Sequence, residues 1–88
     1  MDDNESKKKI IQRLKRIEGQ IRGIQKMIED EKYCIDVLTQ VSAARAALDR
    51  VGMIIFEEHS HSCLLRAIED GQVDAIDELM GALKRLLN

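Results

Sequence analysis

The fold is decided by the stretch YCIDVLTQVSAARAALDRVGMIIFEEHSHSCLLRAIE, which runs from Tyr33 to Glu69. Read as one uninterrupted helix, this stretch brings His59 and Cys63 onto one face, because residues four apart lie one above the other. Such a pair is half of a metal site. Cys34 lies 25 residues before His59, which corresponds to about 37 Å along a straight helix. One chain therefore cannot close a site from all three residues.

A second copy of the chain, packed antiparallel, could bring the three residues together. In such a pair the residue numbers of two facing residues add up to a constant, and the twofold axis lies at half that sum. Pairing Cys34 with His59 or Cys63 therefore puts the axis near positions 47 and 48. The sequence there, from Ser42 to Leu48, is SAARAAL, and its small side chains let two helix backbones approach closely. The sequence thus predicts an antiparallel dimer with an intersubunit Cys/His/Cys metal site.

The composition predicts an all-α protein that depends on oligomerisation. A chain of 88 residues, 44% of them hydrophobic, is long enough for one domain over residues 1–88 with a modest core of its own. It has no proline, and its aromatic residues are one Phe and one Tyr, which favours helices over strands. We expect residues 1–6 to form a disordered arm, with Asn4 or Ser6 as the N-cap of the first helix.

Apolar residues at helical spacing predict three helices, over about Lys7–Glu29, Tyr33–Glu69 and Gln72–Leu87, with a break at Glu29–Lys32 and a helix end at Asp70-Gly71. The first helix has an apolar seam of Ile10, Leu14, Ile17, Ile21, Ile24 and Ile28. The expected inner positions of the second are Cys34, Leu38, Val41, Ala44, Leu48, Val51, Ile55 and His59. Those of the third are Val73, Ile76, Met80, Leu83 and Leu87. The candidate ligands would therefore lie on an apolar stripe.

The sequence also predicts a cytoplasmic protein with an anion-binding surface. No apolar run reaches the ~18 residues of a membrane span, and the first nine residues have no apolar signal core. Two cysteines in a cytosolic chain favour reduced thiols over a structural disulfide. Although the net charge is −2, the segment Lys7–Lys26 holds eight Lys or Arg against Glu18 alone, while Glu57–Glu78 holds seven acids against Arg66. A basic stripe on the first helix can bind phosphates.

The donor set favours Cu(I) over other soft metals. Three ligands are too few for a closed tetrahedral zinc site, and two cysteines are too few for a four-thiolate cluster within one site. Two thiolates and one imidazole suit a trigonal Cu(I) site. His61 lies about 200° around the helix from His59, so we do not expect it to be a primary ligand. A buried cysteine can also be a small hydrophobe, and a single histidine can be a satisfied core residue.

Several segments together resemble the CsoR family of bacterial metal-sensing transcriptional repressors. They are RLKRIEGQIRGI from Arg13 to Ile24, the pair Tyr33-Cys34, QVSA from Gln40 to Ala43, and His59 followed by Cys63. The resemblance covers the chain after Ser6. It implies disc-shaped tetramers, each a dimer of dimers of three-helix protomers. Such tetramers would bind operator double-stranded DNA in the apo state and release it on binding metal, which derepresses copper efflux genes.

The resemblance also implies roles for individual residues. Cu(I), the inducer, would be held by Cys34 of one protomer and by His59 and Cys63 of the other. Tyr33 and Glu78 would complete a hydrogen-bond network with the liganding histidine, Glu78 fitting that position if one residue is deleted near Gly71. The basic positions that meet the operator would be Arg13, Arg50, Lys8, Lys9 and Arg16. Nickel and cobalt members place a histidine where Cys63 stands, and the sulfur-sensing branch typically lacks the histidine at His59.

Three other functions stay open at this point. In a thiol-based sulfur sensor of the same fold, Cys34 and Cys63 of facing protomers would become linked. A structural helical oligomer would have no use for the strong positive charge of the first helix. An enzyme is not expected, because the sequence offers no nucleophile–base pair, Gly-rich phosphate loop or paired carboxylates in a pocket.

Overall fold

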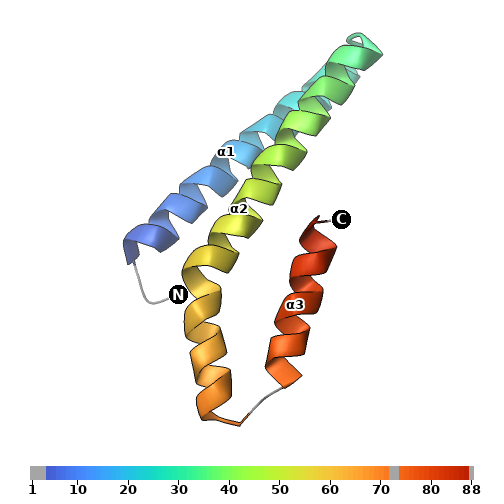
Figure 1. The fold of residues 1–88 in the computed structure, drawn as a ribbon. Coiled ribbons are helices and arrows are strands. Elements are labelled where there is room, and N and C mark those ends of the chain that lie inside the picture. Colours follow the sequence, from blue (N-terminus) through green and yellow to red (C-terminus); the bar gives the residue numbers. More distant parts are fainter. Residues whose placement is uncertain (1–3, 72–73, 88) are drawn as a thin grey trace.

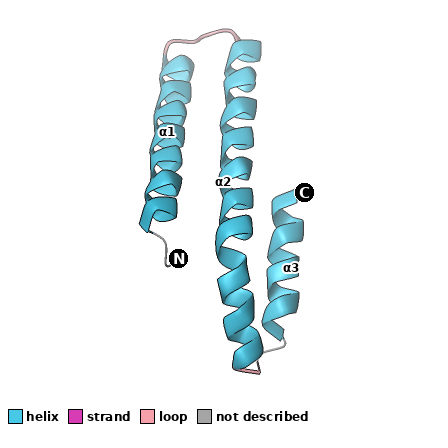
Figure 2. Cartoon of the chain, turned by 60° about the vertical axis from the view of Figure 1, so that its left-hand side comes forward, coloured by secondary structure: helices cyan, strands magenta, loops and turns pink. Residues whose placement is uncertain are grey.

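The computed structural model describes residues 4–71 and 74–87, without the side chains of residues 59–64, 67 and 75. The described residues form three helices and no strand: α1 (Asn4–Glu29), α2 (Cys34–Glu69) and α3 (Asp74–Leu87). α1 and the N-terminal part of α2, as far as Glu58, form an antiparallel hairpin (Figure 1), and α3 lies alongside the C-terminal part of α2 (Figure 2). The predicted all-α class with one long central helix is confirmed.

The first helix begins earlier than the sequence predicted. α1 starts at Asn4, so Asn4, Glu5 and Ser6 are helical and do not belong to an arm of residues 1–6. Residues 1–3 lie outside the described part of the chain. Ser6 lies inside the helix and is not its N-cap; its hydroxyl donates a hydrogen bond to the carboxylate of Glu58 on α2. This contact joins the first turn of α1 to the long helix.

Both helix ends predicted around the long helix are confirmed. Between α1 and α2 the chain turns through residues 30–33, where Glu31 has a left-handed backbone with φ 53° and the Lys32 N–H donates to the carbonyl of Met27 at 2.9 Å. After α2 the chain turns at Gly71, which has φ 72° and donates to the carbonyl of Ile68 at 3.1 Å. Glycine takes this conformation without a Cβ penalty. The expected start of the last helix, Gln72, lies outside the described residues.

The core of the protomer is small and lies between α1 and α2. Its buried members are Ile10, Ile17 and Val51, with Ala47, Ile54 and Ile55 packed against them. Half of the predicted seam of α1 is not covered, since Leu14, Ile21 and Ile28 are exposed. The seam prediction was therefore right for only one side of the helix.

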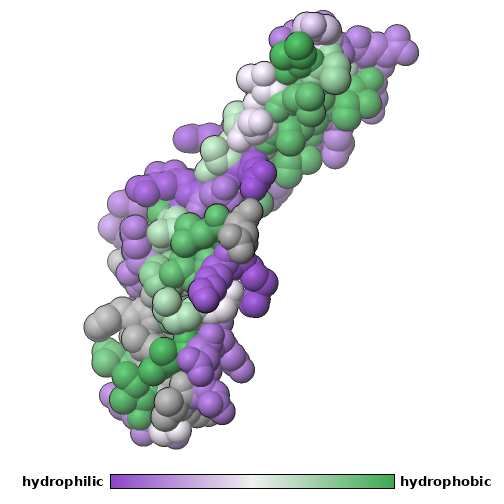
Figure 3. Space-filling view, turned by 45° about the vertical axis from the view of Figure 1, so that its right-hand side comes forward, coloured by the Kyte–Doolittle hydropathy of each residue, from purple (hydrophilic) through white to green (hydrophobic). Residues whose placement is uncertain are grey.

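The predicted inner stripe of α2 is also split between two faces. Ala44 and Val51 are buried against α1, but Leu38, Val41 and Leu48 are exposed, as is Cys34. At 100° per residue, Val51 lies about 100° around the helix from Cys34, so α1 covers a neighbouring face. Cys34, an expected inner position of the stripe, is exposed in the single chain. Figure 3 shows apolar side chains gathered on the surface at the end where α1 and α2 meet.

The predicted inner face of α3 is confirmed in part: Ile76 and Leu83 are partly covered as expected, and Val73 lies outside the described residues. Ile76, Leu79, Leu83 and Leu86 are partly covered, whereas Met80 and Leu87, which we expected to point inward, are exposed. Leu86 lies over Gly52 of α2, where a Cβ would be 2.8 Å from its two methyl carbons. The close approach at Gly52 thus fixes where α3 meets α2. None of the described helices is long and apolar enough to cross a membrane.

Candidate metal site and nucleic-acid surface

Cys34 occupies an accessible position at the start of α2. It is the first residue of the helix, and its side chain is a free, exposed thiol. Tyr33 before it is the N-cap, with φ −55° and ψ 131°, and is itself 65% exposed. The Tyr33 carbonyl accepts a hydrogen bond from the N–H of Val37 at 3.1 Å, so the first turn is closed by the backbone. The phenol and the thiol are therefore both free to meet groups from another chain.

His59 and Cys63 lie in the same helix, near its other end. α2 is continuous from Cys34 to Glu69, so the separation of about 37 Å between Cys34 and His59 holds along its axis. The side chains of His59, His61 and Cys63 lie outside the described residues. Within the residues whose side chains are described, no group of three or more His, Cys, Asp or Glu is placed to hold a metal ion. The helix that the intersubunit hypothesis requires is confirmed, and the ligand roles stay predictions.

Tyr33 and Glu78 are far apart in one protomer. α3 runs back along α2 from the turn at Gly71, and its residue Leu86 meets Gly52 (Figure 2). Eight residues before Leu86, Glu78 lies at the level of about position 60 of α2, because both helices rise equally per residue. Glu78 is exposed and Leu79 is partly covered. One protomer thus puts Glu78 level with His59, while Tyr33 lies at the opposite end of α2.

The five predicted DNA-contacting residues are on the surface. Lys8, Lys9, Arg13 and Arg16 are exposed on α1, and Arg50 is exposed on α2. Among the described residues none of the five is paired with a carboxylate, in contrast to Arg22, which lies 4.0 Å from Glu18. Unpaired cations on a surface are available to phosphate groups.

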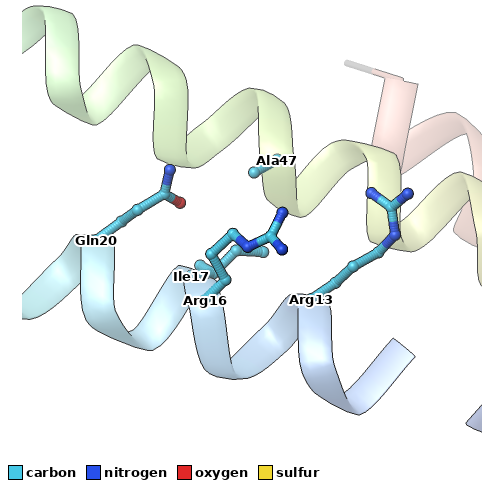
Figure 4. A pocket seen from close by; sticks show the side chains of 5 residues that line it. All are labelled: Arg13, Arg16, Ile17, Gln20 and Ala47. Atoms are coloured by element: carbon cyan, nitrogen blue, oxygen red, sulfur yellow. The ribbon is translucent and has the colours of Figure 1, made fainter. Parts of the chain in front are cut away.

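A small hollow between α1 and α2, here called the notch, contains two of these cations. It has a volume of about 50 Å³ and is lined by Arg13, Arg16, Ile17, Gln20 and Ala47. The arginine and glutamine side chains rise from α1 toward α2, which contributes Ala47 (Figure 4). The Oε1 atom of Gln20 is buried and has no hydrogen-bond partner among the described residues.

Sequence reasoning missed Gln20, Ala47 and the contact between Ser6 and Glu58. A signal existed for Gln20, since it lies four residues after Arg16 and so on the same face of α1. The contribution of Ala47 depends on how the two helices are packed, which the spacing within one helix does not fix. The Ser6–Glu58 contact joins residues 52 positions apart, and it places the start of the basic helix beside the turn of α2 that contains His59.

This architecture of three helices, with a basic α1 and a thiol at the start of a long α2, belongs to a known class of regulators. Residues 6–85 match the family model described as metal-sensitive transcriptional repressor. The chain belongs to this family.

Individual relatives are similar over nearly the whole chain. The copper-sensing transcriptional repressor CsoR of Bacillus subtilis (strain 168) is 46% identical over 83 residues, which are 93% of this chain and 82% of the relative. The copper-sensing transcriptional repressor RicR of Mycobacterium tuberculosis is 47% identical over 78 residues, covering 85% of this chain and 81% of the relative.

Two solved structures share the fold. The crystal structure of the copper-sensing repressor CsoR with Cu(I) from Geobacillus thermodenitrificans NG80-2 is 46% identical and covers 100% of this chain and 93% of the other, with a TM-score of 0.84. The nickel-responsive transcriptional regulator InrS is 42% identical and covers 90% of each chain, with a TM-score of 0.70. The predicted membership of the CsoR family is confirmed.

Proposed function

We propose that this protein is a Cu(I)-responsive transcriptional repressor that binds operator DNA without metal and releases it when Cu(I) binds. The observation that carries the proposal is the continuous α2, which has Cys34 at its first residue and His59 and Cys63 near its end. The relatives named as copper sensors, with identities of 46% and 47%, support copper as the inducer. Copper efflux or resistance genes would be its targets, and the cytoplasm its compartment.

The site requires two protomers. Paired antiparallel about positions 47 and 48, two copies of α2 bring Cys34 of one chain to the level of His59 and Cys63 of the other. The exposed Leu38, Val41 and Leu48 flank the Cys34 face and supply apolar surface for such a pair. On α1, the exposed Leu14, Ile21 and Ile28 offer a second apolar surface, suited to joining two dimers into a disc-shaped tetramer.

The donor set fits Cu(I) on chemical grounds. Two thiolates and one imidazole are soft ligands, and Cu(I) is the soft cation that accepts three of them. A nickel-responsive relative, InrS, has the same fold, so the fold alone does not select the metal. The presence of a thiol at Cys63 is what favours copper in this chain. Tyr33 and Glu78 would hydrogen-bond around His59 and orient its ring.

DNA binding would use the exposed cations of α1 and α2. Lys8, Lys9, Arg13, Arg16 and Arg50 are all accessible, and phosphate contacts of this kind position a protein on the duplex. No pair of helices forms a short helix-turn-helix, because the described helices have 26, 36 and 14 residues. Reading of the operator would then depend on DNA shape more than on base contacts.

A second candidate function is a thiol-based sulfur sensor, and the observation in its favour is the exposed free thiol of Cys34. Copper sensing requires the imidazole of His59, while thiol sensing needs only Cys34 and Cys63. Substituting His59→Ala therefore separates the two functions.

The test is a fluorescence-anisotropy titration of labelled DNA from the protein's own upstream region, with and without stoichiometric Cu(I), in a reducing buffer with controlled chloride. We expect the wild type to bind DNA and to release it with Cu(I). His59→Ala should lose the copper response, and Lys15→Ala, which changes an exposed residue outside the predicted sites, should keep it. Tight DNA binding that Cu(I) leaves unchanged would contradict the proposal, as would an intact inducer response in His59→Ala.

A further inference from the structure

The hydrogen bond between Ser6 and Glu58 joins the start of the basic helix to the turn of α2 that contains His59. The Ser6 hydroxyl donates to the Glu58 carboxylate across 52 positions of sequence. Ser6 is partly covered and Glu58 is exposed. Glu58 directly precedes His59 in α2, which is continuous over Cys34–Glu69. A shift of the turn that contains His59 therefore moves the acceptor of this bond.

This bond lies at the end of the contact between α1 and α2. Ser6 and Glu58 continue the register of Ile17 and Ala47, which meet in the notch, because the residue numbers of both pairs have the same sum. In this register Asn4, the first residue of α1, lies opposite position 60 of α2. Beyond this level α2 runs beside α3, and the described part of α1 does not reach it (Figure 2). The basic helix thus begins level with the proposed metal ligand.

The Glu58 carboxylate is suited to hold the first turn of α1. The first N–H groups of a helix lack partners within the helix, and its N-terminal end carries a partial positive charge. An anionic acceptor beside this end is favourable, and a hydrogen bond to a charged acceptor is roughly twice as strong as one between neutral groups. Lys8 and Lys9, two of the predicted DNA contacts, are exposed and follow Ser6 by two and three residues. Holding Ser6 in place therefore fixes the turn that carries these cations.

We propose that Ser6 and Glu58 form a link through which Cu(I) binding at His59 lowers the affinity for DNA. While the bond is made, Glu58 positions the first turn of α1 and its two lysines for the duplex. Displacement of the adjacent His59 by the metal breaks the bond, and the released turn must be ordered again when DNA binds, which lowers the affinity. The inference rests on the proposed function and adds to it a positioning pair separate from the network around the histidine ring.

Electrostatic repulsion alone predicts the opposite effect for the loss of Glu58. A carboxylate near a DNA-binding surface repels phosphates, so its removal should strengthen DNA binding. The positioning role predicts that its removal weakens DNA binding in the absence of metal. Glu57→Met is the matched control for Glu58→Met, because Glu57 is the neighbouring exposed carboxylate and lies about 100° around the helix from Glu58. Both substitutions remove the same charge, and only Glu58→Met removes the acceptor of the Ser6 hydroxyl.

The experiment is a double-mutant cycle that is followed by DNA binding of the full chain. Ser6→Ala, Glu58→Met and the double variant are titrated with labelled upstream DNA, with and without stoichiometric Cu(I), beside Glu57→Met and Ser6→Thr. Ser6→Thr keeps the hydroxyl. Alanine is a better helix former than serine, so Ser6→Ala does not weaken α1 through helix propensity. Retention of Cu(I) is measured by competition with a chelator, and helicity by circular dichroism.

We expect Ser6→Ala to weaken metal-free DNA binding about fivefold relative to the wild type, and Glu58→Met by the same factor relative to Glu57→Met. The affinity of the Cu(I)-loaded protein for DNA should stay unchanged, so that the effect of Cu(I) on DNA binding falls about fivefold. The double variant should lose no more than Glu58→Met alone, because both substitutions remove the same bond. Ser6→Thr should match the wild type. By reciprocity, the factor by which DNA weakens Cu(I) binding should fall equally in Ser6→Ala.

The possible failures can be told apart. Equal losses of DNA affinity with and without Cu(I) would show that the bond only stabilises the fold, and additive losses in the double variant would show that the two residues act separately. If the wild type responds to Cu(I) and folded Ser6→Ala responds equally, the link is wrong and the proposed function stands. If Glu58→Met loses Cu(I) because it adjoins His59, the comparison of Ser6→Ala with Ser6→Thr decides alone. A wild type that does not bind DNA, or that Cu(I) does not release, overturns the proposed function and the link together.

Discussion

Leu86 of α3 packs over Gly52 of α2 so closely that a Cβ atom at Gly52 would lie 2.8 Å from both of its methyl carbons. A contact under 3.0 Å forces the neighbour to move, and here the group that must move is the end of the flexible Leu86 side chain. Gly52 is thus the point at which α3 approaches α2, on the same helical face as Cys34, since 18 residues at 100° each make five full turns. The position of α3 and the proposed metal face of α2 are therefore linked.

The first prediction is a double-mutant cycle at this contact. Gly→Ala within a helix is worth about 1 kcal/mol of stabilisation when nothing obstructs the Cβ. In the wild type the displacement of the Leu86 side chain should reduce that gain, whereas in a Leu86→Ala background Gly52→Ala should stabilise by about 1 kcal/mol. The measurement is the free energy of unfolding by chemical denaturation at one fixed protein concentration. Equal effects of Gly52→Ala in both backgrounds would show that the two residues do not interact in solution.

Much of the fold could be predicted because its determinants are local. The absence of proline, the helical spacing of apolar residues and the glycine at position 71 indicate three helices and the turns between them. The burial of each apolar residue could not be predicted. Leu38 and Val51 belong to the same series of apolar residues at helical spacing, and the position of α1 decides that Val51 is 2% exposed and Leu38 58% exposed. The register of α3 likewise depends on a nonlocal contact, Leu86 on Gly52.

For the candidate site, the sequence predicts the residues and the need for two chains. It does not show that Cys34 and Tyr33 are exposed in a protomer, because exposure depends on which face of α2 the hairpin covers. Nor could it reveal the notch, which requires Gln20 of one helix and Ala47 of another to lie together. The spacing of residues within a helix indicates which of them share a face. It does not indicate which face a neighbouring helix covers, and that depends on the packing between helices.

The second prediction tests the intersubunit site by complementation. Protomers with Cys34→Ala are mixed with protomers with Cys63→Ala under conditions that exchange subunits. In an antiparallel heterodimer one site loses both thiols, while the other combines the intact Cys34 of one chain with the intact His59 and Cys63 of the other. We therefore expect each heterodimer to bind one Cu(I) tightly, whereas each homodimer binds none tightly, as measured by competition with a Cu(I) chelator. A wild-type monomer that holds Cu(I) through all three side chains would contradict the antiparallel arrangement.

The third prediction concerns the basic surface outside the notch. Arg50 is exposed on α2 and has no carboxylate partner among the described residues. If it contacts a phosphate, Arg50→Ala should reduce the salt dependence of DNA binding by about 0.9 in log K per log[salt]. Arg22→Ala is the control, because this substitution removes the same formal charge from an arginine that already lies 4.0 Å from the carboxylate of Glu18. An unchanged slope in Arg50→Ala, with Arg13→Ala unchanged as well, would move the DNA-binding surface elsewhere.

The last prediction separates the holding of metal from the response to it. Two thiolates should supply most of the affinity for Cu(I), and His59 should report occupancy through its second ring nitrogen, which hydrogen-bonds the network of Tyr33 and Glu78. Glu78 lies at the level of His59 along α2 in the same protomer, while Tyr33 is at the far end and would come from the partner chain in an antiparallel dimer. The network would therefore join two protomers and two helices around one histidine.

Tyr33→Phe and Glu78→Gln should leave Cu(I) tightly bound, since neither removes a ligand. Both should reduce the coupling free energy, the difference in DNA affinity between the apo and Cu(I)-bound protein, which in allosteric systems is typically ~1–3 kcal/mol. Cys34→Ala, in contrast, should lose both metal binding and response. The measurement is a pair of DNA titrations for each variant, with and without stoichiometric Cu(I), beside a chelator competition. If Cu(I) releases DNA fully from both Tyr33→Phe and Glu78→Gln, movement of the ligands alone displaces the helices and the network is not the switch.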